Sequence, residues 1–374
     1  MDSLLEWLSL SLVPGLGPRG WKKLMDVYGG PGRVLSSSRE DLQRRVPGIS
    51  GKVLSGIQAD TLKKAADKEL QKAEQLDVSI LTQQDSSYPA LLKNIHDPPP
   101  LLYVKGDPGF VGSRSIGMVG ARASTTYGQR IAFDLSRRLT LQGLTVVSGL
   151  ALGIDTASHQ GALKGSGATV AVLGCGIDVM YPRQNRNLCD EIASNGAVVS
   201  EYPFGTRPEA FRFPARNRII SGLSLGVVVV EAAKKSGSLI TADFALEQGR
   251  EVFAIPGRVD SSKSEGTHRL LQNGAKLVHT VEDILEELGP FFSSSGSIEN
   301  GLAETVQGVE DLSADEEKLL GFMDIYPQPI DSLIRQSGML PQKVNELLLT
   351  LELKGVVEAL AGQQFQLRSS VGEG

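Results

Sequence analysis

The middle of the chain alternates short apolar runs with longer segments of helical periodicity. From Ser115 onward there are seven β-branched or apolar runs: Ile116–Val119, Thr145–Ser148, Thr169–Leu173, Ala197–Ser200, Val227–Val230, Val252–Ile255 and Lys276–Val278. Strands that alternate with helices predict a parallel sheet. The run Val227–Val230 is apolar at every position, which is typical of a central strand covered on both faces. We therefore predict an extended Rossmann-like α/β domain over residues 110–288.

The first segment, residues 1–75, contains a repeated motif. Val13-Pro-Gly-Leu-Gly and Val46-Pro-Gly-Ile-Ser-Gly are 33 residues apart, and each precedes a helical run. This pattern predicts an N-terminal helical domain with two helix-hairpin-helix-like units. In such hairpins the turn and the next helix direct backbone N–H groups at a phosphate. A pair of tight turns in a small helical bundle fits the pattern equally well.

Proline and glycine separate this helical domain from the α/β domain. Residues 76–109 include Tyr88-Pro, the prolines Pro98 to Pro100 and Gly106-Asp-Pro-Gly, all of which resist regular helix. We predict a connector here, with an edge strand at Leu101–Val104.

The last part of the chain is predicted to form a linker and a winged helix. Residues 289–312 are rich in Ser and Gly and contain no basic residue, which indicates a flexible linker. Residues 313–374 predict three helices and a β-wing, at Ala314–Asp324, Asp331–Gln336, Pro341–Lys354 and Val356–Leu367.

Composition and cysteine usage narrow the class of protein. Hydrophobic residues make up 41% of the chain and charged residues 22%, which excludes a disordered chain. Two cysteines, Cys175 and Cys189, form neither a disulfide framework nor a metal-ligand set. The N-terminus lacks a basic region, and no run of about 18 apolar residues occurs. We predict a reduced, cytoplasmic protein without membrane contact.

The distribution of charge points to an anionic ligand for the first two-thirds of the chain. The formal net charge is −5, yet residues 1–75 carry 12 Lys/Arg against 9 Asp/Glu, and residues 110–219 carry 12 against 7. Residues 289–312 carry four acids and no base, and residues 313–374 carry 9 acids against 5 bases. The third helix of the predicted winged helix, Pro341–Lys354, is neutral within this acidic domain. We therefore expect it to contact protein rather than DNA.

Two glycine-rich turns follow the first two predicted strands of the α/β domain. In open parallel sheets, ligands bind outside the carboxyl ends of the strands. The first turn, residues 120–128, offers Gly120 for close backbone approach and Arg122 as a forked phosphate donor. The second turn begins with Ser148 and Gly149 and passes through Gly153 into a helix, whose N-terminus favours an anion. Both turns are predicted to hold phosphate.

Further candidates follow three later strands. They are Arg183 after Tyr181-Pro, the basic and aromatic cluster Arg212, Phe213, Arg216, Asn217 and Arg218, and the turn Ser236, Gly237 and Ser238. Arginines beside aromatic rings suit a sugar-phosphate backbone with stacked bases, which points to single-stranded nucleic acid. Arg216 and Arg218 cannot both face one side of a helix, so one of them is expected to hold structure through Asp155 or Glu231.

The common signatures of nucleotide enzymes are missing. There is no G-x-x-x-x-G-K-[ST] motif, and Gly149-x-x-x-Gly153 is not a dinucleotide fingerprint. The four histidines are scattered without carboxylate partners, and Glu231 is interpreted as a structural carboxylate. We predict no cofactor, no metal and no catalytic set, and therefore no enzyme.

Four motifs together resemble the DNA-processing protein A family, also called Smf. They are Met118-Val-Gly-Ala-Arg122, Ser148-Gly-Leu-Ala-Leu-Gly-Ile-Asp155, Phe213-Pro-Ala-Arg-Asn-Arg-Ile-Ile220 and Glu231-x-x-x-x-Ser-Gly-Ser-Leu-Ile-Thr241. The resemblance is dense over residues 85–285. The chain departs from the family pattern at His268, where Asn is common, and at Leu152, where a basic residue is frequent.

The resemblance implies a homodimeric bacterial protein that binds incoming single-stranded DNA during natural transformation and loads the RecA recombinase onto it. It also implies that Arg122, Arg183 and the segment from Arg212 to Arg218 face the DNA. Two alternatives remain at this stage. One is a phosphoribohydrolase-like enzyme that cleaves nucleoside monophosphates. The other is a protein adaptor that acts through its winged helix.

Overall fold

The computed structural model of the chain describes residues 3–59, 61–292, 313–323, 328–354, 356–360 and 364–367. The chain divides into two compact units, Met1–Ser295 and Gly296–Gly374. Of the predicted linker 289–312, residues 289–292 belong to the last helix of the first unit, and the remainder lies outside the described residues.

Short capped helices form the N-terminal part of the first unit. They are α1 (Leu4–Ser11), α2 (Pro18–Tyr28), α3 (Pro31–Ser36), α4 (Arg39–Arg45), α5 (Gly51–Ile57) and α6 (Thr61–Gln75). Ser3, Ser38 and Ser50 each accept a hydrogen bond from a backbone N–H of the first turn, which caps α1, α4 and α5. Trp7 and Trp21 anchor the core, with ring centres 5.4 Å apart.

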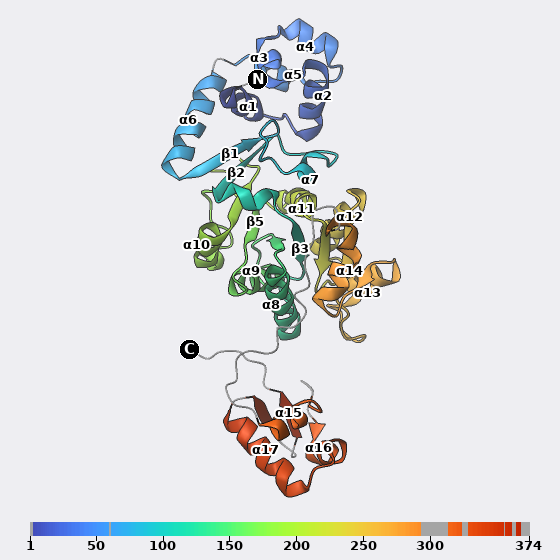
Figure 1. The fold of residues 1–374 in the computed structure, drawn as a ribbon. Coiled ribbons are helices and arrows are strands. Elements are labelled where there is room, and N and C mark those ends of the chain that lie inside the picture. The colour runs from blue at the N-terminus through green and yellow to red at the C-terminus, as the bar shows by residue number, and fades with distance from the viewer. Residues whose placement is uncertain are drawn as a thin grey trace. The chain divides into compact units, whose positions relative to one another are not determined.

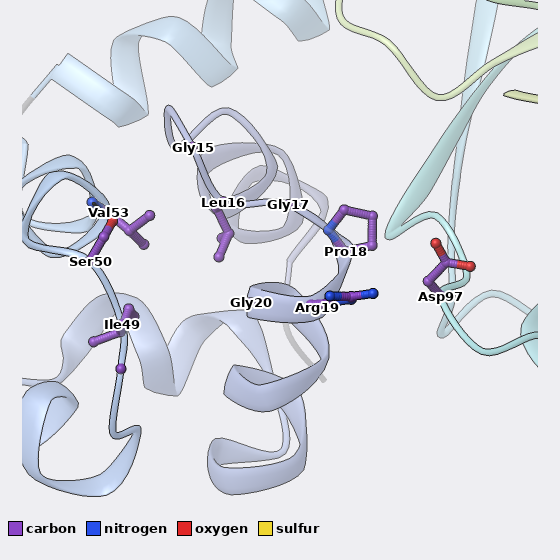
Figure 2. A pocket seen from close by; sticks show the side chains of 11 residues that line it. Gly15, Leu16, Gly17, Pro18, Arg19, Gly20, Ile49, Ser50, Val53 and Asp97 are labelled. Atoms are coloured by element: carbon purple, nitrogen blue, oxygen red, sulfur yellow. Dashed lines mark hydrogen bonds between the residues drawn. The ribbon is translucent and has the colours of Figure 1, made fainter. Parts of the chain in front are cut away.

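The repeated motif forms two matching turns. Gly15 and Gly48 both have φ +85°, the left-handed region that favours glycine. The N–H of Leu16 donates to the Val13 carbonyl at 3.1 Å, and the N–H of Ile49 donates to the Val46 carbonyl at 3.3 Å. Both turns line one hollow of about 460 Å³ (Figure 2). The two segments therefore have matching turns, and their contact with a phosphate stays a prediction.

A nine-stranded sheet forms the centre of the first unit (Figure 1). Its order is β1-β2-β6-β5-β4-β3-β7-β8-β9. Strands β3 to β9 pair in parallel and match the seven predicted runs: β3 (Ser115–Val119), β4 (Thr145–Ser148), β5 (Thr169–Leu173), β6 (Ala197–Ser200), β7 (Gly226–Val229), β8 (Glu251–Ala254) and β9 (Lys276–Leu277). The α/β fold class with a mostly parallel sheet is confirmed.

The segment predicted as a connector adds two strands to this sheet. β1 (Val78–Thr82) and β2 (Leu101–Gly106) pair antiparallel, and β2 pairs antiparallel with β6. Tyr103 of β2 is fully buried and packs with Leu8 of α1 and Ala66 of α6. The prolines at 98–100 lie in the loop before β2 rather than within a strand. The two strands thus join the helical part to the sheet.

Helices cover both faces of the sheet. One face carries α8 (Thr126–Leu141), α9 (Ile154–Lys164), α10 (Arg186–Asn195) and α14 (Val281–Phe292). The other face carries α7 (Ala90–Lys93), α11 (Arg212–Leu223), α12 (Gly237–Glu247) and α13 (Glu265–Gln272). Val227 and Val229 pack on one face and Val228 on the other, which explains why the β7 run is apolar at every position.

The second unit is a winged helix. It contains α15 (Ala314–Leu320), α16 (Ile330–Ser337), α17 (Pro341–Leu353) and a sheet of order β10-β12-β11. The strands are β10 (Gln328–Pro329), β11 (Val357–Leu360) and β12 (Gln364–Leu367). Gly338 ends α16 in the left-handed conformation, as the Ser337-Gly338 turn predicted. The three helices and the wing are confirmed, whereas β10 has no counterpart in the prediction.

Candidate nucleic-acid interface

The glycine-rich turns meet at the carboxyl ends of β3, β4 and β7, which are neighbours in the sheet. β3 lies where the strand order reverses, the usual ligand position in open α/β sheets. A hollow of about 490 Å³ opens there, which we call the sheet-edge hollow. Eight of the predicted residues line it: Gly120, Arg122, Phe213, Arg216, Asn217, Ser236, Gly237 and Ser238.

Arg122 lies on the first turn, and its exposed guanidinium rests on an aromatic pair. Its Cζ is 5.2 Å from the centre of the Phe213 ring, and that ring lies 5.4 Å from the ring of Tyr181. Tyr181 also lines the hollow. A cation and two rings at one rim are the elements that bind a sugar-phosphate backbone and stacked bases.

Glu231 fixes the first turn from the end of β7. Its buried carboxylate accepts the N–H of Thr125 at 2.8 Å and the hydroxyl of the same residue. A Cβ at Gly128 would lie 2.5 Å from the Glu231 carboxyl carbon, so a larger residue at this point would displace the carboxylate from Thr125. The structural role predicted for Glu231 agrees with these contacts.

The second turn differs from its prediction, because three of its polar groups form hydrogen bonds within the protein. The Ser148 hydroxyl is buried and donates to the Met118 carbonyl at 2.6 Å. The N–H groups of Gly149 and Ala151 both donate to the Asp155 carboxylate, each at 3.2 Å. Ser148 and Gly149 are therefore unavailable to a phosphate in this conformation. Their predicted role is corrected to shaping the turn.

Gly153 allows the second turn to approach the first. It has φ +82°, and a Cβ there would lie 2.5 Å from the Arg122 carbonyl oxygen. This position permits close backbone contact between the two turns, and the residue itself does not line the hollow. The predicted phosphate contact of Gly153 stays a prediction.

Arg216 is buried at the floor of the sheet-edge hollow. Its guanidinium donates to the Gly149 carbonyl at 2.8 Å and to the Val172 carbonyl. Burial lowers the pKa of this guanidinium, and the nearby Asp155 carboxylate opposes that shift. Arg216 therefore supplies positive charge to the floor from a fixed position.

Arg218 does not line the hollow, and its buried ion pairs give the predicted contact with DNA no support. Its side chain is 5% exposed and forms ion pairs with Glu201 at 2.5 Å and with Asp97 at 3.2 Å. Burial alone would lower the pKa of its guanidinium, but these two carboxylates raise it above the usual value. Both arginines of the pair hold structure, Arg218 through Glu201 and Asp97, and Arg216 through the Gly149 and Val172 carbonyls beside Asp155.

Arg212 and Arg183 flank the hollow without lining it. Arg212 lies over the rings of Tyr202 and Phe211, at 4.9 and 5.0 Å, and pairs with Glu209 at 3.0 Å. Arg183 is exposed on a 3-10 turn, Arg183–Asn185. Both extend the cationic and aromatic surface beyond the rim.

The start of α12 closes the hollow on its far side. The Ser236 hydroxyl caps the helix by accepting the Ser238 N–H at 3.4 Å, and the two hydroxyl groups are 2.7 Å apart. The amide of Asn217 donates to the Gly237 carbonyl at 3.3 Å, which ties α11 to this turn. The structure thus brings these predicted residues together at a helix N-terminus.

Several residues of the site were missed in the sequence. Thr241 lines the hollow, and its buried hydroxyl has no hydrogen-bond partner. Lys234 and Lys235 are exposed directly before Ser236. The two lysines are adjacent to a predicted turn, so their positive charge was a signal by which they could have been predicted as DNA contacts. Thr241 ends the fourth motif of the family resemblance, but it was not predicted as a contact because the direction of its hydroxyl depends on helix packing.

Metal ligands do not gather in the part of the chain that the structure describes. His159 is fully buried beside Thr169, and burial lowers its pKa to about 3, so the ring is neutral.

Within the described residues, no helix has both the length and the apolar composition needed to cross a membrane.

Comparison with known proteins decides the family. Residues 79–289 match the family model of DNA recombination-mediator protein A, and residues 303–363 match the DprA winged helix domain. The chain belongs to the DNA recombination-mediator protein A family. The predicted resemblance to the DNA-processing protein A family is therefore confirmed. Neither family model covers residues 1–78.

Some members of this family are similar to the chain over more of its length than the two family models cover. Protein Smf of Synechocystis is 34% identical over 97% of this chain and 98% of its own length. The solved structure of DNA processing protein A from Streptococcus pneumoniae superposes with a TM-score of 0.69 at 38% identity, covering 76% of this chain and 98% of that one. A Helicobacter pylori homologue, whose structure concerns its single-stranded DNA binding mode, gives a TM-score of 0.53 at 31% identity, covering 58% and 97%.

Proposed function

We propose that this chain binds single-stranded DNA at the sheet-edge hollow and loads the RecA recombinase onto it during natural transformation. The observation that carries the proposal is Arg122 stacked on Phe213, which lies beside Tyr181 at the rim of the hollow. Stacking on rings requires exposed base faces, which a single strand offers and a duplex does not. The single-stranded DNA binding of the H. pylori homologue supports the same ligand class.

The remaining parts of the proposal rest on the family. We propose that the protein acts in the cytoplasm as a homodimer, as the family resemblance implies. The acidic winged helix is proposed to contact protein, since repulsion disfavours its approach to phosphates.

Recombinase loading is testable by adding the protein to DNA coated with single-strand binding protein. RecA should then hydrolyse ATP sooner, and an unchanged lag would contradict loading.

Replacing Arg122 tests the binding site directly. We expect Arg122→Ala to weaken binding to fluorescent oligo-dT by about tenfold to a hundredfold, because a phosphate contact and a stacked cation are both lost. Fluorescence anisotropy across a salt series should also show a slope of log K against log salt that is shallower by about 0.7.

Arg138→Ala is the matched control, since Arg138 lies in the last turn of α8, the helix that follows the Arg122 turn. It should bind as the wild type does. Equal affinity of wild type and Arg122→Ala would remove this site. Equal binding of single-stranded and duplex DNA would contradict the proposed ligand.

A further inference from the structure

The turn between β4 and α9 contains a residue in an unfavourable conformation. Leu150 is fully buried and has φ +57°, a left-handed conformation that costs a non-glycine residue about 1–2 kcal/mol. Such a conformation persists only where neighbouring contacts determine it. The residues that hold this turn therefore control the shape of the sheet-edge hollow, because Ala151 and Asp155 line it.

Besides Thr156, whose hydroxyl donates to the Ala151 carbonyl at 2.8 Å, three side chains hold the turn, and they come from α9, α11 and the 3-10 turn Arg183–Asn185. Asp155 accepts two of its N–H groups, and Arg216 donates to the Gly149 carbonyl. The third is Asn185, which is 5% exposed. Its amide nitrogen donates to the Leu150 carbonyl at 2.9 Å and lies 2.9 Å from the Thr156 hydroxyl oxygen.

Asn185 differs from the other two in its position along the chain. It ends the 3-10 turn that begins at Arg183, and the exposed Tyr181 precedes that turn. One buried amide thus joins the turn after β4 to the loop that carries Arg183. A side-chain amide has two N–H donors, which match the two oxygens at 2.9 Å, and a third oxygen, the Ala151 carbonyl, lies at 3.5 Å. A carboxylate of the same shape has no donor.

We infer that Asn185 is a positioning residue for nucleic-acid binding. It fixes the loop of Arg183 and Tyr181 relative to the turn after β4, so that both sides of the site present one surface to the strand. Asn185 itself is buried and does not touch the ligand. The inference rests on the proposed function, because its effect is read through DNA affinity.

The isosteric change Asn185→Asp tests this role. We expect it to weaken oligo-dT binding about tenfold. The buried carboxylate has no N–H to donate, so both hydrogen bonds are lost and its oxygens repel the two acceptor oxygens. Asn187→Asp is the matched control. Asn187 is exposed two residues further on, in the first turn of α10, so this variant adds the same charge close by without removing a buried amide and should bind nearly as wild type.

A double-mutant cycle separates positioning from general destabilisation. Arg183→Ala should weaken binding in the wild-type background and have a much smaller effect in Asn185→Asp, because the arginine is already misplaced. Simple addition of the two losses, or wild-type affinity of Asn185→Asp, would overturn the inference. Failure of the wild type itself to bind oligo-dT would instead overturn the proposed function.

Thr156 gives a second route if Asn185→Asp does not fold. Thr156→Ser keeps the hydroxyl oxygen that Asn185 contacts and should retain DNA affinity. Thr156→Val keeps the shape but removes both the oxygen that Asn185 contacts and the hydroxyl's own hydrogen bond to the Ala151 carbonyl. It should lower affinity several-fold, again without additivity with Arg183→Ala. Equal affinity of the two Thr156 variants would contradict the role of the amide.

Discussion

Arg218→Ala should lower the free energy of unfolding by about 3–5 kcal/mol, because breaking a buried ion pair leaves a carboxylate uncompensated. The stranded group is Glu201, whose side chain is only 11% exposed, while Asp97 is 34% exposed and can recover hydration. Urea denaturation followed by circular dichroism measures the change. Under conditions in which the variant is folded, its affinity for oligo-dT should differ little from that of the wild type.

A second substitution, at the ion-pair partner Glu201, distinguishes a lost ion pair from a lost contact with DNA. The double variant Arg218→Met with Glu201→Met should recover much of the stability, since apolar residues often replace a buried pair at little cost. Arg122→Ala changes an exposed residue and should stay within about 0.5 kcal/mol of wild type. If Arg218→Ala kept the stability of the wild type but bound DNA weakly, Arg218 would be a DNA contact rather than a structural residue.

Gly153→Ala should destabilise the protein by about 2–5 kcal/mol and also weaken single-stranded DNA binding, since backbone strain and overpacking both act there. The new Cβ would meet the carbonyl oxygens of Ala121 and Arg122. These carbonyls belong to the first turn, so relief of the clash must move the segment that carries the Arg122 side chain. Thermal unfolding and anisotropy report the two effects separately.

Gly143→Ala provides the matched control for this glycine. Gly143 also has a positive φ, +75°, but a Cβ there would meet nothing within 4 Å. We expect a loss of only about 1–2 kcal/mol from the backbone conformation and no change in DNA affinity. Similar losses in the two variants would show that the close approach at Gly153 matters little.

The order of elements in the α/β domain could be predicted from the sequence because each depends on local pattern. The apolar run Val227–Val230 predicted a central strand, and both faces of β7 are covered in the fold. The antiparallel strands β1 and β2 were harder to predict. Their pairing joins segments that a proline-rich loop separates, and proline signals a turn without showing what flanks it.

Side-chain direction limited the prediction of the site. Arg216 and Arg218 are two residues apart in one motif, yet only Arg216 lines the hollow. The partners that hold Arg218, Asp97 and Glu201, lie in distant loops that no local signal connects to it. Ser148 and Gly149 were correctly placed at a strand end, but their hydrogen bonds depend on Met118 and on Asp155 in the folded turn.

The antiparallel strands β1 and β2 determine where the chain can be shortened. β2 covers the backbone edge of β6 from Ala197 to Ser200. A fragment that begins at residue 110 would expose that edge as unpaired N–H and C=O groups, which recruit strands from other molecules. It would also expose the apolar surface that Leu102 and Val104 cover. A fragment that begins before Val78 keeps the β6 edge paired and this apolar surface covered, although it loses the packing of Tyr103 on α1 and α6. The segment that the sequence presents as a connector is therefore part of the folded α/β unit.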